Sequence, residues 1–106
     1  MPKYLVQANL VGAGIAGLRK AGGTGRRAAV DRLAESLGGR VEAMYFAFGD
    51  TDVYIILELP DAASMAAAAL TAAASGEVAV KTTVLLTAEE VDAATKKVPH
   101  YRPPGQ

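Results

Sequence analysis

Glu58 and Lys81 are the two ionisable residues of this sequence best suited to acid–base chemistry. Each lies in a run of strand-forming residues, Val53–Leu59 and Glu77–Leu86, and alternation places both on the same side of a sheet. With one strand between them, the two side chains would lie ~10 Å apart, which leaves room for a small ligand. A carboxyl and an amine at that separation could exchange protons with a bound molecule. The alternative is that both side chains reach solvent at the rim of the sheet.

The same predicted sheet face carries further polar and aromatic side chains. We expect a ligand site made of these residues: Gln7, Tyr54, Glu58 and Lys81 as polar contacts, with Met44 and Phe46 as an apolar wall. An apolar surface with a few converging polar groups is the usual composition of a ligand site. A partly hydrated dimer interface has a similar composition, so both interpretations stay open at this point. In either case, apolar surface of this extent is seldom left bare.

A second candidate site lies in the stretch Gly22–Arg27, which reads GGTGRR. Glycines ahead of a predicted helix N-terminus leave backbone N–H groups free to bind an anion. Thr24 is the expected N-cap residue, and Arg26 and Arg27 would add positive charge, so these three residues could bind a phosphate or a carboxylate. The alternative is structural, because Arg27 can pair with Asp31 one helical turn later and Arg26 can stay solvated.

The stretch Gly12–Gly17 matches the GxGxxG pattern of dinucleotide-binding folds. That pattern requires a helix that starts within it and a parallel strand that ends in an acidic residue about 20 positions later. Here further glycines follow, the acidic position falls within a predicted helix, and the next strand begins only at Arg40. We therefore interpret the stretch as a flexible loop, with at most a short helix over residues 15–20. We expect no cofactor.

Composition argues against several other classes of function. The chain has no cysteine and a single histidine, His100, so neither a metal centre nor a hydrolytic triad is expected. Asp50 and Asp52 could share a cation, but a tight turn explains both residues. The formal net charge of zero gives no basis for binding nucleic acid or an anionic membrane. We find no signal peptide or membrane-spanning segment, and therefore expect a cytoplasmic protein with no membrane partner.

The elements that position these residues alternate strands and helices. Alternating apolar residues predict strands at Lys3–Leu10, Arg40–Phe48, Val53–Leu59 and Glu77–Leu86. Capping and stop signals predict helices from Thr24 to Gly38, from Asp61 to Gly76, and from the capping box at Thr87–Glu90 to Val98. The fold class is α+β: a ferredoxin-like βαββαβ unit with an antiparallel four-stranded sheet and an added C-terminal helix. Residues 1–98 would form one domain and residues 99–106 an extended proline-rich tail.

Several segments together resemble the GYD-domain family, small bacterial proteins of the dimeric α/β-barrel superfamily. They are KYLVQAN (residues 3–9), the long stretch from GGTGRR to ELPD (22–61), KTTVLLTAEEVDAA (81–94) and the terminal YRPPGQ. The resemblance implies a subunit whose uncovered sheet face pairs with a second copy to form a barrel, as a homodimer or a multiple of dimers. The alanine-rich composition favours a partner independently, since a short chain with few large side chains fills its own core poorly.

The chain departs from the family pattern at the motif that gives the family its name. The hairpin reads Gly49-Asp50-Thr51-Asp52 where the family has Gly-Tyr-Asp, so the family's tyrosine has no counterpart here. The leading hypothesis is a homodimer that binds a small molecule in the barrel interior, as a sensor or accessory protein. The alternatives are a cofactor-free enzyme, monooxygenase- or isomerase-like, acting on a small aromatic or acidic metabolite with Glu58 or Tyr54 as acid or base, and a purely structural oligomer. Fold alone does not choose among them.

Overall fold

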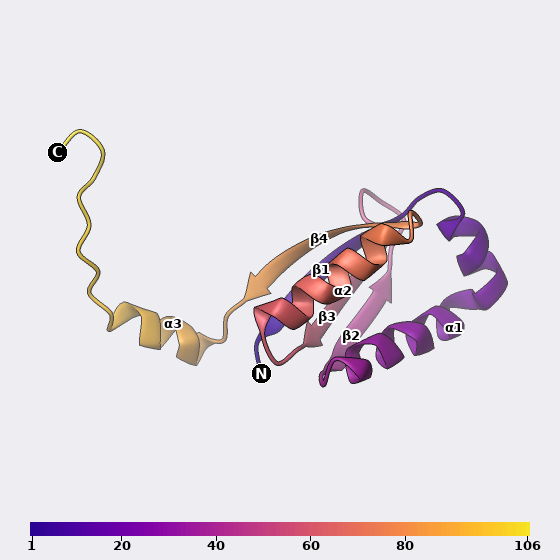
Figure 1. Cartoon of the computed structure of the whole chain (residues 1–106), viewed down its shortest axis with the longest axis horizontal. Helices are drawn as coiled ribbons and strands as arrows, with labels where there is room; N and C mark the ends of the chain where they lie inside the picture. The colour runs from indigo at the N-terminus through magenta and orange to yellow at the C-terminus, as the bar shows by residue number, and fades with distance from the viewer.

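The chain folds into strands and helices in the predicted order. The computed structural model describes all 106 residues. Its elements are β1 (Lys3–Leu10), α1 (Gly14–Ser36), β2 (Arg40–Phe46), β3 (Val53–Glu58), α2 (Ala62–Ala74), β4 (Val78–Leu85) and α3 (Ala88–Thr95). The strands form one antiparallel sheet in the order β2-β3-β1-β4 (Figure 1). This topology confirms the predicted α+β, ferredoxin-like βαββαβ fold with a C-terminal helix.

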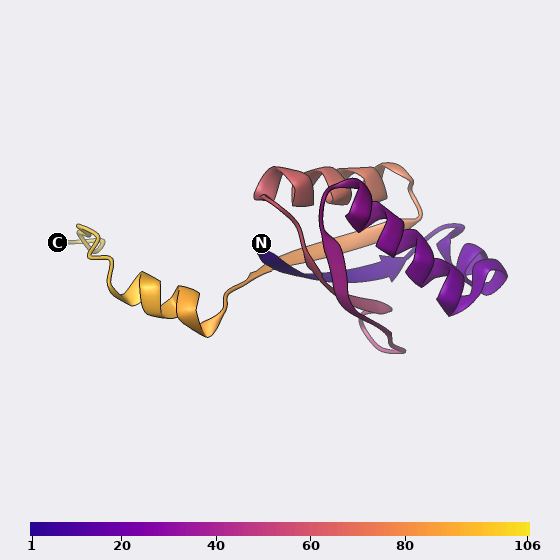
Figure 2. The same ribbon diagram turned by 90° about the horizontal axis from the view of Figure 1, so that it is seen from below.

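The two long helices cover the same face of the sheet, and the opposite face carries no helix (Figure 2). α1 packs against β2, and α2 packs against β4. Because side chains alternate along a strand, the helices bury every second residue of the two central strands. The core consists mainly of Tyr4, Val6 and Ala8 from β1, Val53, Ile55 and Leu57 from β3, and Val30, Leu59, Met65 and Ala68. Each fully buried large side chain contributes roughly 1.5–3 kcal/mol.

A break inside α1 replaces the predicted loop. Gly22 has φ 75° and ψ 172°, which interrupt the helical backbone, and such a positive φ favours glycine. Helix begins earlier than the sequence predicts, at Gly14, so the interpretation of Gly12–Gly17 as a loop is wrong in its second half. The second helical segment begins directly after Gly22, close to the predicted start, but the break lies at Gly22 rather than at Thr24, so the prediction that Thr24 is the cap is wrong.

A β-bulge in β2 changes which residues face the helices. The register between β2 and β3 shifts between Val41 and Ala43, so one extra residue reverses the alternation that follows. Met44 pairs with Ile55 and Phe46 with Val53, both on the helix-covered face. The prediction that Met44 and Phe46 line the uncovered face is therefore wrong. The ring of Phe46 lies against α1 instead, 3.3 Å from where a Cβ atom of Gly23 would stand.

Local capping signals place the starts of the two later helices correctly. Asp61 caps α2, and its Oδ1 accepts a hydrogen bond from the Ser64 backbone N–H at 2.8 Å. This hydrogen bond holds the pKa of the Asp61 carboxyl below its ordinary value. Thr87 and Glu90 form the predicted capping box of α3, with reciprocal hydrogen bonds of 3.1 and 3.0 Å. None of the helices combines the length and apolar character needed to cross a membrane.

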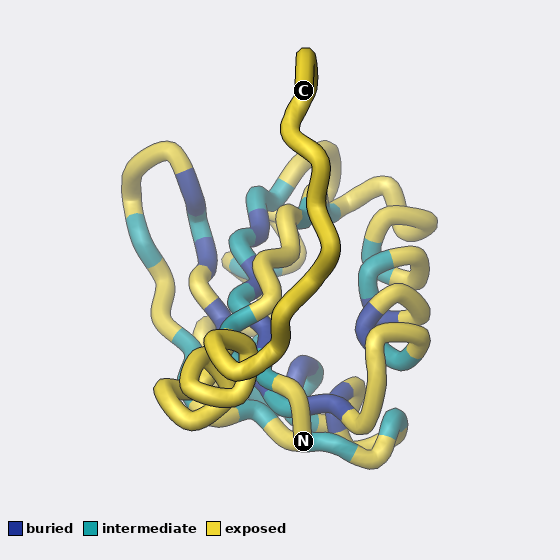
Figure 3. Tube along the Cα trace, turned by 90° about the vertical axis from the view of Figure 1, so that its left-hand side faces the viewer, coloured by how far each residue is buried: buried dark blue, intermediate teal, exposed yellow.

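The C-terminal arm, defined here as Leu86–Gln106, projects from the end of β4 (Figures 1 and 3). Every residue of the arm is exposed, including all of α3. The arm stretches the molecule to 56 Å, with a radius of gyration of 16.7 Å. A compact domain of this size would have a radius of gyration of about 13 Å. The arm therefore lacks any packing partner within its own chain.

Candidate functional site

The uncovered sheet face, defined as the face without helices, brings three predicted site residues into one row. Gln7 of β1 pairs with Tyr54 of β3 on one side and with Lys81 of β4 on the other. Tyr45 of β2 pairs with Tyr54 and extends the row to the sheet edge. Paired residues of antiparallel strands point to the same face, so these side chains stand next to one another at the ~5 Å strand spacing.

A hollow of about 350 Å³ lies at one end of this row. Its lining consists of Gln7, Asn9, Asp50, Thr51, Ala79, Val80 and Lys81. The hydroxyl of the buried Thr51 donates to the Gln7 side-chain oxygen at 3.2 Å. The Lys81 amine and the Asp50 carboxylate have no ion-pair partner in the chain. The hollow therefore offers one free cation, one free anion and amide groups to a bound molecule.

The loop between β2 and β3 closes one side of this hollow, and Asp52 anchors it. The Asp52 carboxylate accepts a hydrogen bond from the Leu10 backbone N–H at 2.9 Å. The Asp52 backbone N–H donates to the Asn9 side-chain oxygen at 3.0 Å. These contacts tie the loop to the end of β1 and so hold Asp50 and Thr51 over the hollow. They give Asp52 a structural role of the kind that the predicted tight turn implies.

Glu58 lies at the opposite end of the uncovered face, in an ion-pair cluster with Lys3, Arg40 and Glu42. The Arg40 Nε is 2.7 Å from Glu58 Oε2, and the Lys3 Nζ is 3.7 Å from Glu58 Oε1. Lys3 Nζ also donates to Glu42 at 2.5 Å. That hydrogen bond raises the pKa of Lys3 and lowers the pKa of Glu42, because it favours the charged form of each group. The cluster balances its own charge.

The register separates Glu58 from Lys81. Glu58 pairs with Lys3, whereas Lys81 pairs with Gln7, four residues further along β1. Four residues of strand and two strand spacings amount to roughly 16 Å. The expected separation of ~10 Å is therefore wrong, although β1 does lie between the two strands as predicted. The structure brings Gln7, Tyr54 and Lys81 together and leaves Glu58 apart from them.

The residues of the predicted anion site have different surroundings. Arg27 Nε donates to Asp31 Oδ1 at 3.1 Å, which is the one-turn pair that the structural alternative predicted. Arg26 lines an apolar groove between α1 and α2, and Thr24 is exposed. The fold thus assigns Arg27 a contact within α1 and places Arg26 beside a different feature of the molecule.

Close packing against the start of β4 explains one glycine of the GxGxxG stretch, Gly14. α1 does begin within it, at Gly14, as a nucleotide-binding turn would require. However, β1 pairs only with β3 and β4 and is antiparallel to both, so the parallel βαβ unit of that motif is missing. A Cβ atom at Gly14 would overlap the carbonyl oxygen of Glu77. Glycine at this position is therefore required by the close approach of α1 to the start of β4.

The candidate site includes residues that were not predicted from the sequence. Asn9 alternates with Gln7 along β1, so the same strand pattern could have identified it. Asp50 and Thr51 reach the hollow only because the loop folds back over β1, and their spacing in the sequence gives no such signal.

Comparison with known proteins gives one match. The family model described as GYD domain matches residues 4–95, from the second residue of β1 to the last residue of α3. No curated protein and no solved structure matches the chain.

Proposed function

This chain belongs to the GYD-domain family, and from that premise we propose that two copies pair through their uncovered sheet faces and bind a small polar molecule in the hollow beside Gln7 and Lys81. The observation that carries the proposal is a sheet face without helices that ends in a hollow whose only cation, Lys81, has no carboxylate partner. The protein would act by binding, as a sensor or accessory subunit.

The uncovered face has the composition of an interface between two sheets. Tyr45 is 72% exposed and Tyr54 40% exposed, and Leu5 and Ile56 lie half-buried beside them. A second sheet packed ~10 Å away would remove this surface from water, at roughly 25 cal/mol for each Å² of apolar area. Tyrosine is favoured at such surfaces because its ring buries well while its hydroxyl finds a polar partner. The face therefore supports a second copy as its cover.

The ion-pair cluster at the far end of the face is compatible with that pairing. It contains two carboxylates, Glu42 and Glu58, and two cations, Lys3 and Arg40. Because the charges cancel, a second copy can approach this end without a net repulsion. The cluster would then lie at the polar rim that surrounds the apolar centre of most interfaces.

The hollow favours a small molecule that carries an acidic group. Its volume of about 350 Å³ lies in the range of small-molecule sites, about 300–1,000 Å³. Lys81 would pair with a carboxylate or similar anion, and the side-chain amides of Gln7 and Asn9 would bind neighbouring polar groups. Asp50 would accept a hydrogen bond from a hydroxyl or amine of the same molecule. Closure by a second sheet would strengthen these contacts by excluding water.

Native mass spectrometry of the full chain, purified without added ligand, tests the proposal. We expect dimers, or multiples of dimers, that carry a stoichiometric small adduct. Tyr45→Glu should give monomers, because it places a charge on the paired faces where the exposed ring of Tyr45 would be buried. The matched control is Leu70→Glu, since Leu70 is 71% exposed on α2 away from this face. Dimers without an adduct would overturn the ligand part of the proposal, and monomers of the unaltered protein would overturn the pairing.

A further inference from the structure

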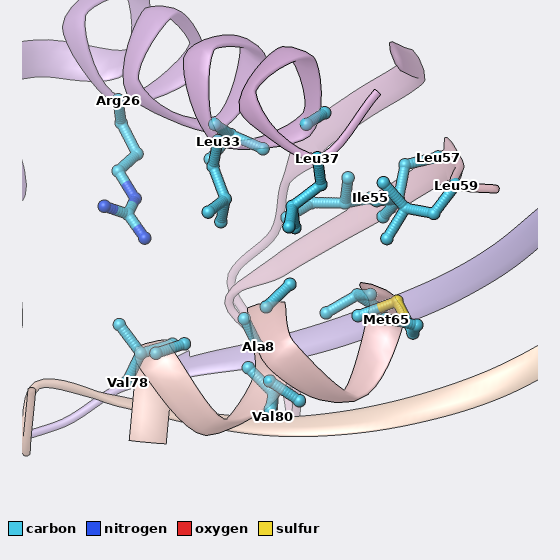
Figure 4. A pocket seen from close by; sticks show the side chains of 16 residues that line it. Ala8, Arg26, Leu33, Leu37, Ile55, Leu57, Leu59, Met65, Val78 and Val80 are labelled. Carbon is cyan, nitrogen blue, oxygen red and sulfur yellow. The ribbon is translucent and has the colours of Figure 1, made fainter. Parts of the chain in front are cut away.

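An apolar groove lies on the helix-covered face, between α1 and α2 (Figure 4). α1 packs over β2 and α2 over β4, so the two helices leave the middle of the sheet partly open. All but one of the 16 lining residues are hydrophobic. Leu33 and the C-cap residue Leu37 form the α1 wall, Met65 and Ala69 form the α2 wall, and Ile55 lies in the floor. Leu33 remains 37% exposed, so the groove still has apolar surface to bury.

Arg26 is the one charged residue in the lining of the groove. Figure 4 shows its side chain at the end of the groove near Val78, away from Leu59 and Met65. No carboxylate of the chain lies within ion-pair distance of Arg26. A segment that filled the groove and paired with Arg26 would therefore combine apolar side chains with an acidic group at one end.

The size of the groove favours protein side chains over a small ligand. Its cavity volume is about 70 Å³, less than half of the ~150 Å³ of a cavity that binds benzene. One or two aliphatic side chains that project from a helix fit such a space. An amphipathic helix laid along an apolar groove is a common mode of protein recognition.

α3 has the matching chemistry and no partner of its own. Val91, Ala94 and, beyond the end of the helix, Val98 recur at helical spacing on one side. At about 3.6 residues per turn, Glu90 and Asp92 flank this side, whereas Glu89 lies on the opposite side of the helix. α3 has eight residues, and an isolated helix shorter than about 12–15 residues is marginal in water. The helix therefore needs a surface to pack on.

We infer that α3 of one copy docks in the groove between α1 and α2 of a second copy, with Val91 against Leu33 and Asp92 beside Arg26. The inference requires a second copy but neither the pairing of sheet faces nor the bound ligand proposed above. It also supplies the missing cover for a small core, since only 12 of the 106 residues are buried in the single chain.

The backbone of the chain's own arm does not reach the Arg26 end of its own groove. The arm leaves β4 at Leu85, which pairs with Lys3, whereas the Arg26 end of the groove lies at Val78. The seven residues of strand between Val78 and Leu85 span ~23 Å. A chain that turned straight back at Leu85 would carry Asp92 only ~16 Å, through three extended and four helical residues. The arm of a second copy does not start from this β4, so the limit on its reach does not apply.

Cysteine cross-linking tests this docking directly, because the chain contains no native cysteine. One sample of the full chain carries Leu33→Cys and another carries Val91→Cys, and the two are mixed and oxidised. We expect a disulfide-linked species of two chains that forms well above the level of a control mixture of Leu70→Cys with Val91→Cys. Circular dichroism of each variant confirms that the fold is retained.

Two further measurements separate the possible occupants. A chain with both Leu33→Cys and Val91→Cys should link to other chains; closure within a single chain would overturn the inference in favour of the chain's own arm. Linking no stronger than the control would overturn it in favour of a different occupant. Arg26→Glu should lower the yield of the linked species several-fold, and Asp92→Arg in the other chain should restore it.

Discussion

Both ends of the uncovered sheet face contain carboxylates and cations, but these charges are paired at one end and unpaired at the other. At one end, Glu58 and its neighbours form a cluster in which each carboxylate has a cation within ion-pair distance. At the other end, Lys81 and Asp50 have no such partner. Charged groups that are already paired gain little from a ligand, whereas unpaired groups gain charge-assisted hydrogen bonds. The comparison explains why we propose the ligand site at the unpaired end, since the contacts of a carboxylate or an amine decide whether it is free to bind a ligand.

Substitution of Lys81 should have the largest effect on that difference. Lys81→Ala removes the cation of the hollow, and hydrogen bonds to charged groups are worth about 1.5–3 kcal/mol. We therefore expect the affinity for the bound molecule to fall by a factor of about 10–150. The measurement is the fraction of protein that carries the adduct in native mass spectrometry.

Glu58→Gln is the matched control for the opposite end. It removes a charge from the same sheet face but from the self-paired cluster, so the adduct should be retained. Loss of the adduct in Glu58→Gln and its retention in Lys81→Ala would reverse the comparison and place the site at the cluster.

A smaller effect is expected from the loop that closes the hollow. Asp52→Ala leaves the Leu10 backbone N–H without its side-chain acceptor, and such an unsatisfied, part-buried group costs about 1–2 kcal/mol. The measurement is the free energy of unfolding in urea. Asp50→Ala is the control, because the Asp50 side chain has no hydrogen bond within the chain, and its stability should stay within about 0.5 kcal/mol of the unaltered protein. Equal losses in the two variants would show that Asp52 does not anchor the loop.

Much of the fold could be predicted because its signals are local. The caps at Asp61 and at Thr87–Glu90 are short patterns in which a side chain meets a nearby backbone N–H, and both are confirmed. The face of β2 could not be predicted. One extra residue between Val41 and Ala43 reverses the alternation of side chains between the two faces, and no residue type at this position indicates a bulge. The helical segment after Gly22 starts close to the predicted cap at Thr24, but the sequence does not show which of the neighbouring glycines makes the break.

The candidate site was predicted in part for a similar reason. Alternation along β1, β3 and β4 is enough to place Gln7, Tyr54 and Lys81 on one face. Alternation does not give the register, that is, which residues of neighbouring strands pair with each other. For this reason the sequence places Glu58 nearer to Lys81 than the structure does. The contributions of Asp50 and Thr51 depend on a loop that folds over a strand more than 40 residues earlier in the chain.

The smallest effect should come from the pH dependence of the cluster. The hydrogen bond from Lys3 lowers the pKa of Glu42 in the folded state, so this carboxyl holds its proton less tightly when folded than when unfolded. Its contribution to stability is therefore present above 4.5, the ordinary pKa of a glutamate, and is lost as pH falls through the lower folded value. Exposed ion pairs contribute little, and salt should reduce this contribution further.

We expect Glu42→Gln to unfold at slightly lower urea concentration than the unaltered protein near neutral pH, with the difference vanishing in acid. Glu35→Gln, on the exposed side of α1 and without an ion pair, should show no such pH dependence. A difference that persisted in acid would mean that Glu42 stabilises the sheet edge by packing rather than by charge, and the two ends of the face would then differ in more than their ion pairing.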